Sequence, residues 1–243
     1  MTLGFIILRC VWKTEDNILW QTCYQSIRKF YTNPILIVDD NCKEGLLDTN
    51  FPMIDVQIVQ SEKDMIGAAE ILPYYFFHLL HPFDIAVVVH DSMFFRCYYD
   101  FENYPLTDVV FLWEFGYFPD CPEKETELIL QTKKSEDTMK LYLSKQWSGC
   151  NGAASMVTWN FVDQMDSQLG VFSCIPLLRK QRKYRNGFER VYSVLCHQLS
   201  EKITHNRSLF GRLFCPTGSY GNSISSVEQY KGSCPIFKVQ RGR

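Results

Sequence analysis

Carboxylate side chains stand at the ends of two apolar runs, and these residues are the best placed to do chemistry. Asp39 and Asp40 follow the run 34–38, and Asp91 follows the run 85–89. Unbroken Val, Ile and Leu runs are typical of strands covered on both faces. A single Asp after a strand also starts turns or caps helices. Because polar groups at the carboxyl ends of parallel strands share one crevice, the repeated pattern favours a ligand site.

Two further features have alternative interpretations. His90 precedes Asp91 and is either a ligand or a packed core histidine. The segment 179–190 is strongly basic, which predicts either an exposed loop or a surface for polyanions such as nucleic acid. We favour the loop. Its basic residues are Arg179, Lys180, Arg182, Lys183, Arg185 and Arg190.

The elements that position these residues alternate in the first half of the chain. Predicted strands cover residues 3–8, 35–38, 55–59, 85–89 and 109–113, and predicted helices cover 15–31 and 65–80. Pro73 lies within the second helix and predicts a kink or a break there. A strand, a helix and a strand joined by a right-handed crossover predict an α/β fold with a parallel core.

The second half begins with a polar stretch, 118–134, which predicts a loop leading into an exposed helix. We place there the boundary between two halves, 1–117 and 118–243, of a single domain. The loop 147–156 is rich in small residues, which let backbone approach a ligand or neighbour closely. Helices are predicted at 158–169 and 189–203, and a strand at 235–239.

Composition indicates a globular protein with an ample core. The chain has 243 residues, 46% of them hydrophobic and 15% aromatic, and a formal net charge of −2. This balance does not call for nucleic acid as a partner. The ten cysteines show neither CxxC pairs nor zinc-finger spacing, which favours free thiols in a reducing compartment over a secreted, disulfide-linked protein.

The amino-terminal apolar stretch is too short for a signal peptide and has no basic leader. No run approaches the roughly 18 apolar residues of a membrane-spanning helix. We therefore expect a protein without a transmembrane segment in the cytoplasm.

The order of these features resembles the nucleotide-sugar-dependent glycosyltransferases of the GT-A type, especially the inverting family 2. The pattern is carried by the pair Ser26-Ile27, the run Val38-Asp39-Asp40-Asn41, the stretch 66–70 around Gly67, and the turn His90-Asp91-Ser92. The chain also resembles glycosyltransferase-like proteins of large DNA viruses, which would place it in the host cytoplasm. The resemblance covers residues 3–200, with one carboxylate where family 2 usually has two.

The resemblance implies transfer of a sugar from a nucleoside diphosphate sugar to a hydroxyl of a glycan, protein or small molecule. It implies inversion, with Glu189 as the general base. It implies Mn or Mg bound by Asp91 with help from His90 or Ser92. The donor-binding residues would be Arg9, Asp39, Asp40, Gly67, Asp91 and Arg190.

Three alternatives remain. Basic side chains could replace the metal, with Arg9 or the tail residues Lys238, Arg241 and Arg243 on the diphosphate. The chain could be a catalytically inactive member of the fold, since Arg190 stands where the family has Asp. It could also be a module that binds polyanions through the segment 179–190.

Overall fold

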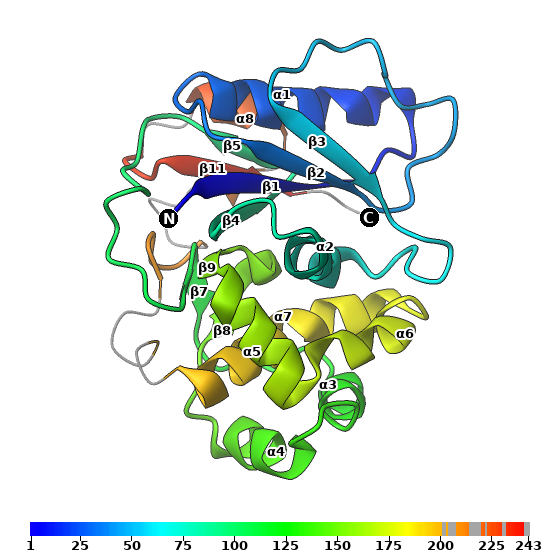
Figure 1. The fold of residues 1–243 in the computed structure, drawn as a ribbon, viewed down its shortest axis with the longest axis vertical. Coiled ribbons are helices and arrows are strands. Elements are labelled where there is room, and N and C mark those ends of the chain that lie inside the picture. The colour runs from blue at the N-terminus through cyan, green and yellow to red at the C-terminus, as the bar shows by residue number, and fades with distance from the viewer. Residues whose placement is uncertain (201–202, 204–207, 214–219, 222, 230–231, 241–243) are drawn as a thin grey trace.

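The computed structural model of the chain has one large mixed sheet between two layers of helices (Figure 1). It describes residues 1–200, 203, 208–213, 220, 221, 223–229 and 232–240. Helix α1 (Asn17–Arg28) covers one face of the sheet. Helices α2 (Leu72–Leu80), α5 (Trp159–Leu169) and α7 (Arg182–Leu199) cover the other. The predicted α/β class is confirmed.

The large sheet has six strands in the order β3-β2-β1-β4-β9-β6. The strands are β1 (Leu3–Arg9), β2 (Ile35–Asp39), β3 (Val56–Gln60), β4 (Ile85–His90), β6 (Val109–Phe111) and β9 (Ser155–Thr158). Strands β1 to β4 are mutually parallel, and β9 runs antiparallel to both β4 and β6. The carboxyl ends of β1, β2 and β4 therefore meet at one edge of the sheet.

The predicted unit of strand, helix and strand at the amino terminus is confirmed. A short 3-10 helix, η1 (Thr14–Asp16), precedes α1. Helix α1 buries Trp20, Cys23, Tyr24 and Ile27 against the sheet, at the spacing of three and four residues that one helix face requires. Burying these apolar side chains holds β1 and β2 side by side.

Two helices begin elsewhere than predicted. In place of a helix from residue 65, a 3-10 helix η2 (Ala69–Ile71) leads into α2, which has Pro73 in its first turn. Proline fits there because the first N–H groups of a helix have no helical partner. Helix α7 begins at Arg182 instead of 189, so the prediction of a loop over the basic segment is wrong for most of its length.

The basic segment is helical because its few apolar residues fall on one face. Tyr184, Phe188 and Val191 are buried at helical spacing in the first turns of α7. Arg and Lys are themselves good helix formers. Charge alone therefore did not distinguish a loop from an amphipathic helix here.

A second, three-stranded sheet joins the end of the chain to the middle. Strand β11 (Ile236–Val239) lies between β10 (Tyr220–Gly221) and β5 (Met93–Phe95), and it pairs antiparallel with β5. The predicted strand at 235–239 is confirmed. Because β5 directly follows the turn at the end of β4, this pairing brings β11 beside the strand ends of the large sheet.

The remaining elements complete the second half. They are β7 (Glu114–Phe115), β8 (Gly149–Cys150), α3 (Pro122–Ile129), α4 (Ser135–Ser144), α6 (Ile175–Leu178), α8 (Ser225–Gln229), η3 (Asn151–Ala153) and η4 (Val171–Cys174). Helix α3 packs on α7 rather than standing exposed, and its Glu125 is buried. Glu125 accepts N–H bonds from Asp120 and Cys121 at 2.8 and 2.9 Å, which compensates its burial.

Within the described ranges, no helix is long and apolar enough to cross a membrane. The nine described cysteines are free thiols, and most are buried or partly buried. Cys215 lies outside the described residues.

Candidate functional site

A cavity of about 240 Å³ lies where β1, β2 and β4 end. Helix η2, helix α7 and strand β11 complete its walls. Both signs of charge line it, so this is the candidate functional site. The acidic, basic and histidine residues that line it are Asp40, Glu70, His90, Asp91, Arg182, Arg185, Glu189 and Lys238.

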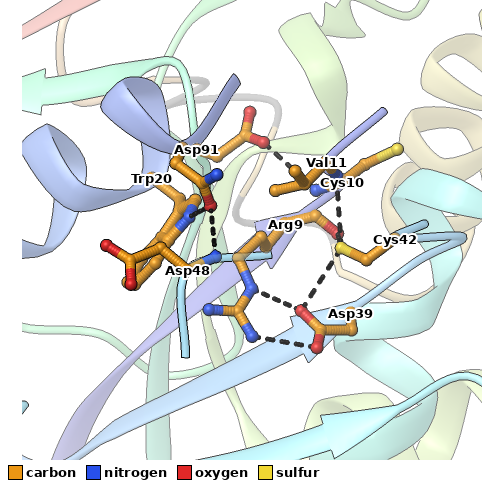
Figure 2. Close-up of polar contacts among 9 residues, drawn as sticks. Arg9, Cys10, Val11, Trp20, Asp39, Cys42, Asp48 and Asp91 are labelled. Carbon is orange, nitrogen blue, oxygen red and sulfur yellow. Dashed lines mark hydrogen bonds and ion pairs between the residues drawn. The ribbon is translucent and has the colours of Figure 1, made fainter. Parts of the chain in front are cut away.

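Asp91 lies at the turn after β4 and is almost fully buried. Its Oδ2 accepts the backbone N–H of Cys10 at 3.2 Å (Figure 2). Its own N–H donates to the carbonyl of Leu8 at 3.0 Å. These bonds tie the ends of β1 and β4 together. The predicted position of Asp91 at a crevice of strand ends is therefore observed.

Asp40 follows β2 and lines the same cavity. It accepts the N–H of Gly67 at 2.6 Å and the N–H of Ala69 at 3.0 Å. Gly67 has a φ of +87°, a conformation that glycine adopts without strain. Burial raises the pKa of Asp40 from its ordinary value despite these bonds. Asp40 thus holds η2 against the sheet, and Gly67 acts through its backbone.

Asp39 and Arg9 lie on the other face of the sheet, because successive strand residues point to opposite faces. They are register partners, and both are buried. Arg9 Nε and Nη2 donate to Asp39 at 2.5 and 2.9 Å (Figure 2). The Arg9 guanidinium lies 4.6 Å from the ring centre of Trp20. Neither residue lines the candidate site, so a role of Arg9 on a phosphate would require this pair to open.

Asp39 instead lines a second cavity of about 610 Å³ beside β2 and β3. Its other walls come from the loop 41–49 and from Gln60, Ser61 and Ile66. The two neighbouring aspartates therefore serve different cavities.

His90 lies at the floor of the candidate site. Its Nε2 is 2.8 Å from the carbonyl of Gly152, and it must donate this bond because a carbonyl only accepts. Burial, and then the charge of Lys238, lowers the pKa of His90 to about 3. The ring is therefore neutral at physiological pH.

Gly152 allows this close packing. A Cβ there would lie 2.8 Å from His90 Cε1 and 2.9 Å from Lys238 Nζ, and the residue has a φ of +63°. The small-residue loop predicted to permit close backbone approach does so at this point. The carbonyl of Gly152 and the ammonium group of Lys238 therefore both lie close to the His90 ring.

Two glutamates, Glu70 and Glu189, line the cavity and interact through their charges. Burial raises the pKa of Glu189, whose Oε2 is 3.2 Å from Arg190 Nη1. Burial, followed by the charge of Glu189, raises the pKa of Glu70 to about 7. Glu70 Oε2 is hidden from solvent and has no hydrogen-bond partner among the described residues. A carboxyl group with a pKa near 7, as Glu70 has, can exchange a proton near neutral pH.

Arg190 itself faces away from the cavity lining. Its guanidinium donates to the carbonyls of Phe118 and Asn186 at 3.1 and 2.9 Å, and it lies 4.6 Å from the ring centre of Phe115. It therefore positions α7 and Glu189. A direct contact of Arg190 with a nucleotide sugar stays a prediction.

The described side chains do not fit a metal ion. His90 Nε2 donates to a carbonyl, which leaves Nδ1 as the ring nitrogen able to bind a metal, and Asp91 Oδ2 accepts a backbone N–H of the residue after β1. In the part of the chain that the structure describes, no three His, Cys, Asp or Glu side chains are grouped to hold a metal. Mn and Mg need several oxygen ligands.

The structure thus brings together Asp40, His90, Asp91 and Glu189 of the predicted residues. Sequence reasoning gave no role to Glu70 and no inward position to Arg182 and Arg185. A carboxylate inside the apolar stretch 68–72 was the available signal for Glu70. Lys238 was considered only as an alternative to a metal, and Arg241 and Arg243 lie outside the described residues.

No protein-family model matches the chain, and no curated protein matches it. Among solved structures, it is similar to the galactosyltransferase LgtC, determined in complex with donor and acceptor sugar analogs. The alignment covers 93% of each chain, with 8% sequence identity and a TM-score of 0.45. So distant a likeness transfers no activity or residue role to this chain.

Proposed function

We propose that the chain is a GT-A-type glycosyltransferase that moves a sugar from a nucleoside diphosphate sugar to a hydroxyl acceptor. One observation carries the proposal. The cavity at the strand ends combines three basic side chains with two glutamates whose pKa values are raised. The basic side chains can neutralise a diphosphate leaving group, and a glutamate can take the proton from an acceptor hydroxyl.

The basic side chains are Arg182, Arg185 and Lys238. None makes a hydrogen bond or an ion pair within 4 Å to a side chain in the described ranges. Their charges are therefore available to an anion. Guanidinium and ammonium groups both bind phosphate oxygens, the former often with two bonds.

In the proposed reaction, the acceptor oxygen attacks the anomeric carbon, the bond from that carbon to the phosphate oxygen breaks, and the acceptor proton passes to Glu189. Attack opposite the leaving diphosphate inverts the configuration. A carboxyl group with a raised pKa holds this proton more readily than an ordinary one. Asp40 and Asp91 would fix the strand ends around the donor.

Several finer predictions stay predictions. They are membership of family 2, the viral resemblance, a cytoplasmic location, assistance by Mn or Mg, and acceptors among glycans, proteins and small molecules. The described residues do not fit a metal ion by themselves, so oxygens of the donor would have to supply most of its ligands beside Asp91.

A panel of uridine, guanosine and thymidine diphosphate sugars tests the proposal. A donor-specific rise in the melting temperature is expected, since a ligand that binds only the folded state stabilises it. The same donor should be hydrolysed slowly without acceptor, and Glu189→Gln should bind it but turn it over far more slowly. If no donor shifts the melting temperature, with or without Mn, the transferase proposal is wrong.

Binding of polyanions is a second candidate, favoured by the exposed residues Arg179 and Lys180 before α7 and Lys183 in its first turn. It predicts an affinity for nucleic acid that falls steeply with salt and does not change when Glu189 is replaced. A donor that binds without turnover would instead indicate a catalytically inactive member of the fold.

A further inference from the structure

Strand β11 delivers one ammonium group to the floor of the candidate site. Lys238 is the register partner of Met93 in β5, and the N–H of Val239 donates to the carbonyl of Ser92 at 2.8 Å. These backbone bonds fix β11 directly beside the turn that contains His90 and Asp91. Lys238 Nζ consequently lies close to Gly152 and to the His90 ring.

The surroundings of Lys238 are acidic but do not neutralise it by direct contact. Its charge acts on Glu70 and Glu189, favouring their ionised forms, and disfavours protonation of His90. No carboxylate of the described residues lies within 4 Å of its Nζ. An ammonium group held among such partners without an ion pair is ready to receive an anion.

Lys238 lines the same cavity as Asp91, the one carboxylate predicted to bind a metal. A divalent cation next to this ammonium would meet like-charge repulsion. The same charge that would repel a metal can neutralise a diphosphate. Arg185 adds a second positive charge from α7, where it acts on Asp40 and Glu70.

We propose that Lys238, with Arg185, holds the diphosphate of the donor in place of a divalent cation, so that nucleoside diphosphates bind without metal. This inference rests on the proposed function and replaces its metal-assisted form. A lysine ammonium group binds phosphate as a point charge. The pairing of β11 with β5 fixes the backbone that carries Lys238, so this charge is held at the cavity.

The test measures the dissociation constants of uridine, guanosine and thymidine diphosphate by calorimetry, in excess EDTA and in excess Mn. For wild type we expect binding of one nucleotide with equal affinity in both media. Lys238→Met should weaken it about 10- to 100-fold, the range for loss of a hydrogen bond to a charged group. Lys238→Arg should restore most of the affinity. Lys140→Met is the matched control, because Lys140 is exposed on α4.

Three outcomes would overturn the inference. If EDTA abolishes binding that Mn restores, the site uses a metal, and the transferase proposal stands without Lys238. If Lys238→Met binds as wild type does in EDTA, the ammonium is not the diphosphate ligand. If no diphosphate binds in either medium, the donor site itself is wrong. If Lys238→Met does not fold, two measurements still test the inference. They are the comparison of EDTA with Mn on wild type, and the nucleotide affinity of Arg185→Met in EDTA.

Discussion

Replacing Glu70 by Gln should stabilise the folded chain at alkaline pH and leave its stability unchanged at acidic pH. Burial and the charge of Glu189 raise the pKa of Glu70 from its ordinary 4.5 to about 7. The folded chain therefore keeps a proton that the unfolded chain releases between these values. This contribution to stability is complete below the unfolded pKa and is lost as the pH rises through the folded one.

The size of the effect follows from the same two values. One pKa unit corresponds to about 1.4 kcal/mol, so the rise from 4.5 to about 7 corresponds to about 3 kcal/mol of unfolding free energy. Gln has the shape of the protonated acid and cannot ionise. The variant should therefore exceed wild type by up to about 3 kcal/mol at alkaline pH.

Urea unfolding of both proteins, well below pH 4.5 and well above pH 7, measures this difference. Glu15→Gln is the control, because Glu15 is exposed in η1 and the exchange should change little at either pH. An equal difference between Glu70→Gln and wild type at both pH values would refute the reasoning. It would mean that the carboxyl group of Glu70 is hydrated in the folded protein.

Three other changes test the site and its support. Glu189→Gln should slow sugar transfer by about 10²- to 10⁴-fold with little change in nucleotide affinity, and a loss of affinity alone would contradict its role as base. Gly152→Ala should unfold in less urea than Gly45→Ala, because both glycines have positive φ but only the Cβ at Gly152 would meet other atoms; equal losses would leave backbone strain as the sole cause. Asp39→Asn should cost about 3–5 kcal/mol of unfolding free energy by leaving the buried guanidinium of Arg9 without a carboxylate. A cost under about 1 kcal/mol in urea unfolding would mean that solvent screens this pair.

The sequence predicted the strand ends well because their signal is local. The apolar runs before Asp40 and Asp91 are too long and too rich in branched residues for surface segments, and both aspartates line the cavity. The apolar run alone did not show that Asp39 and Asp40 point to opposite faces of the sheet. Its place on the other face follows from strand alternation and from pairing with Arg9, a partner thirty residues away.

The rest of the site depends on contacts that no local pattern contains. Arg182 and Arg185 line the cavity because α7 packs its apolar face on helix α3 and strand β8. The sequence shows that Glu70 is an acidic residue, but its raised pKa comes from its burial and from the charge of Glu189. Lys238 reaches the cavity through the pairing of β11 with β5. Tertiary packing decides all three.

That pairing also sets an order for assembly. The strand ends of β1, β2 and β4 come from the first ninety-one residues, whereas β11 joins residues 236–238 to residues 93–95. Contacts between segments so far apart in sequence generally form after local ones, since a long loop must close first. The parallel strands can therefore form before the cavity is complete, and the onset of ligand binding during refolding would report the docking of the last strand.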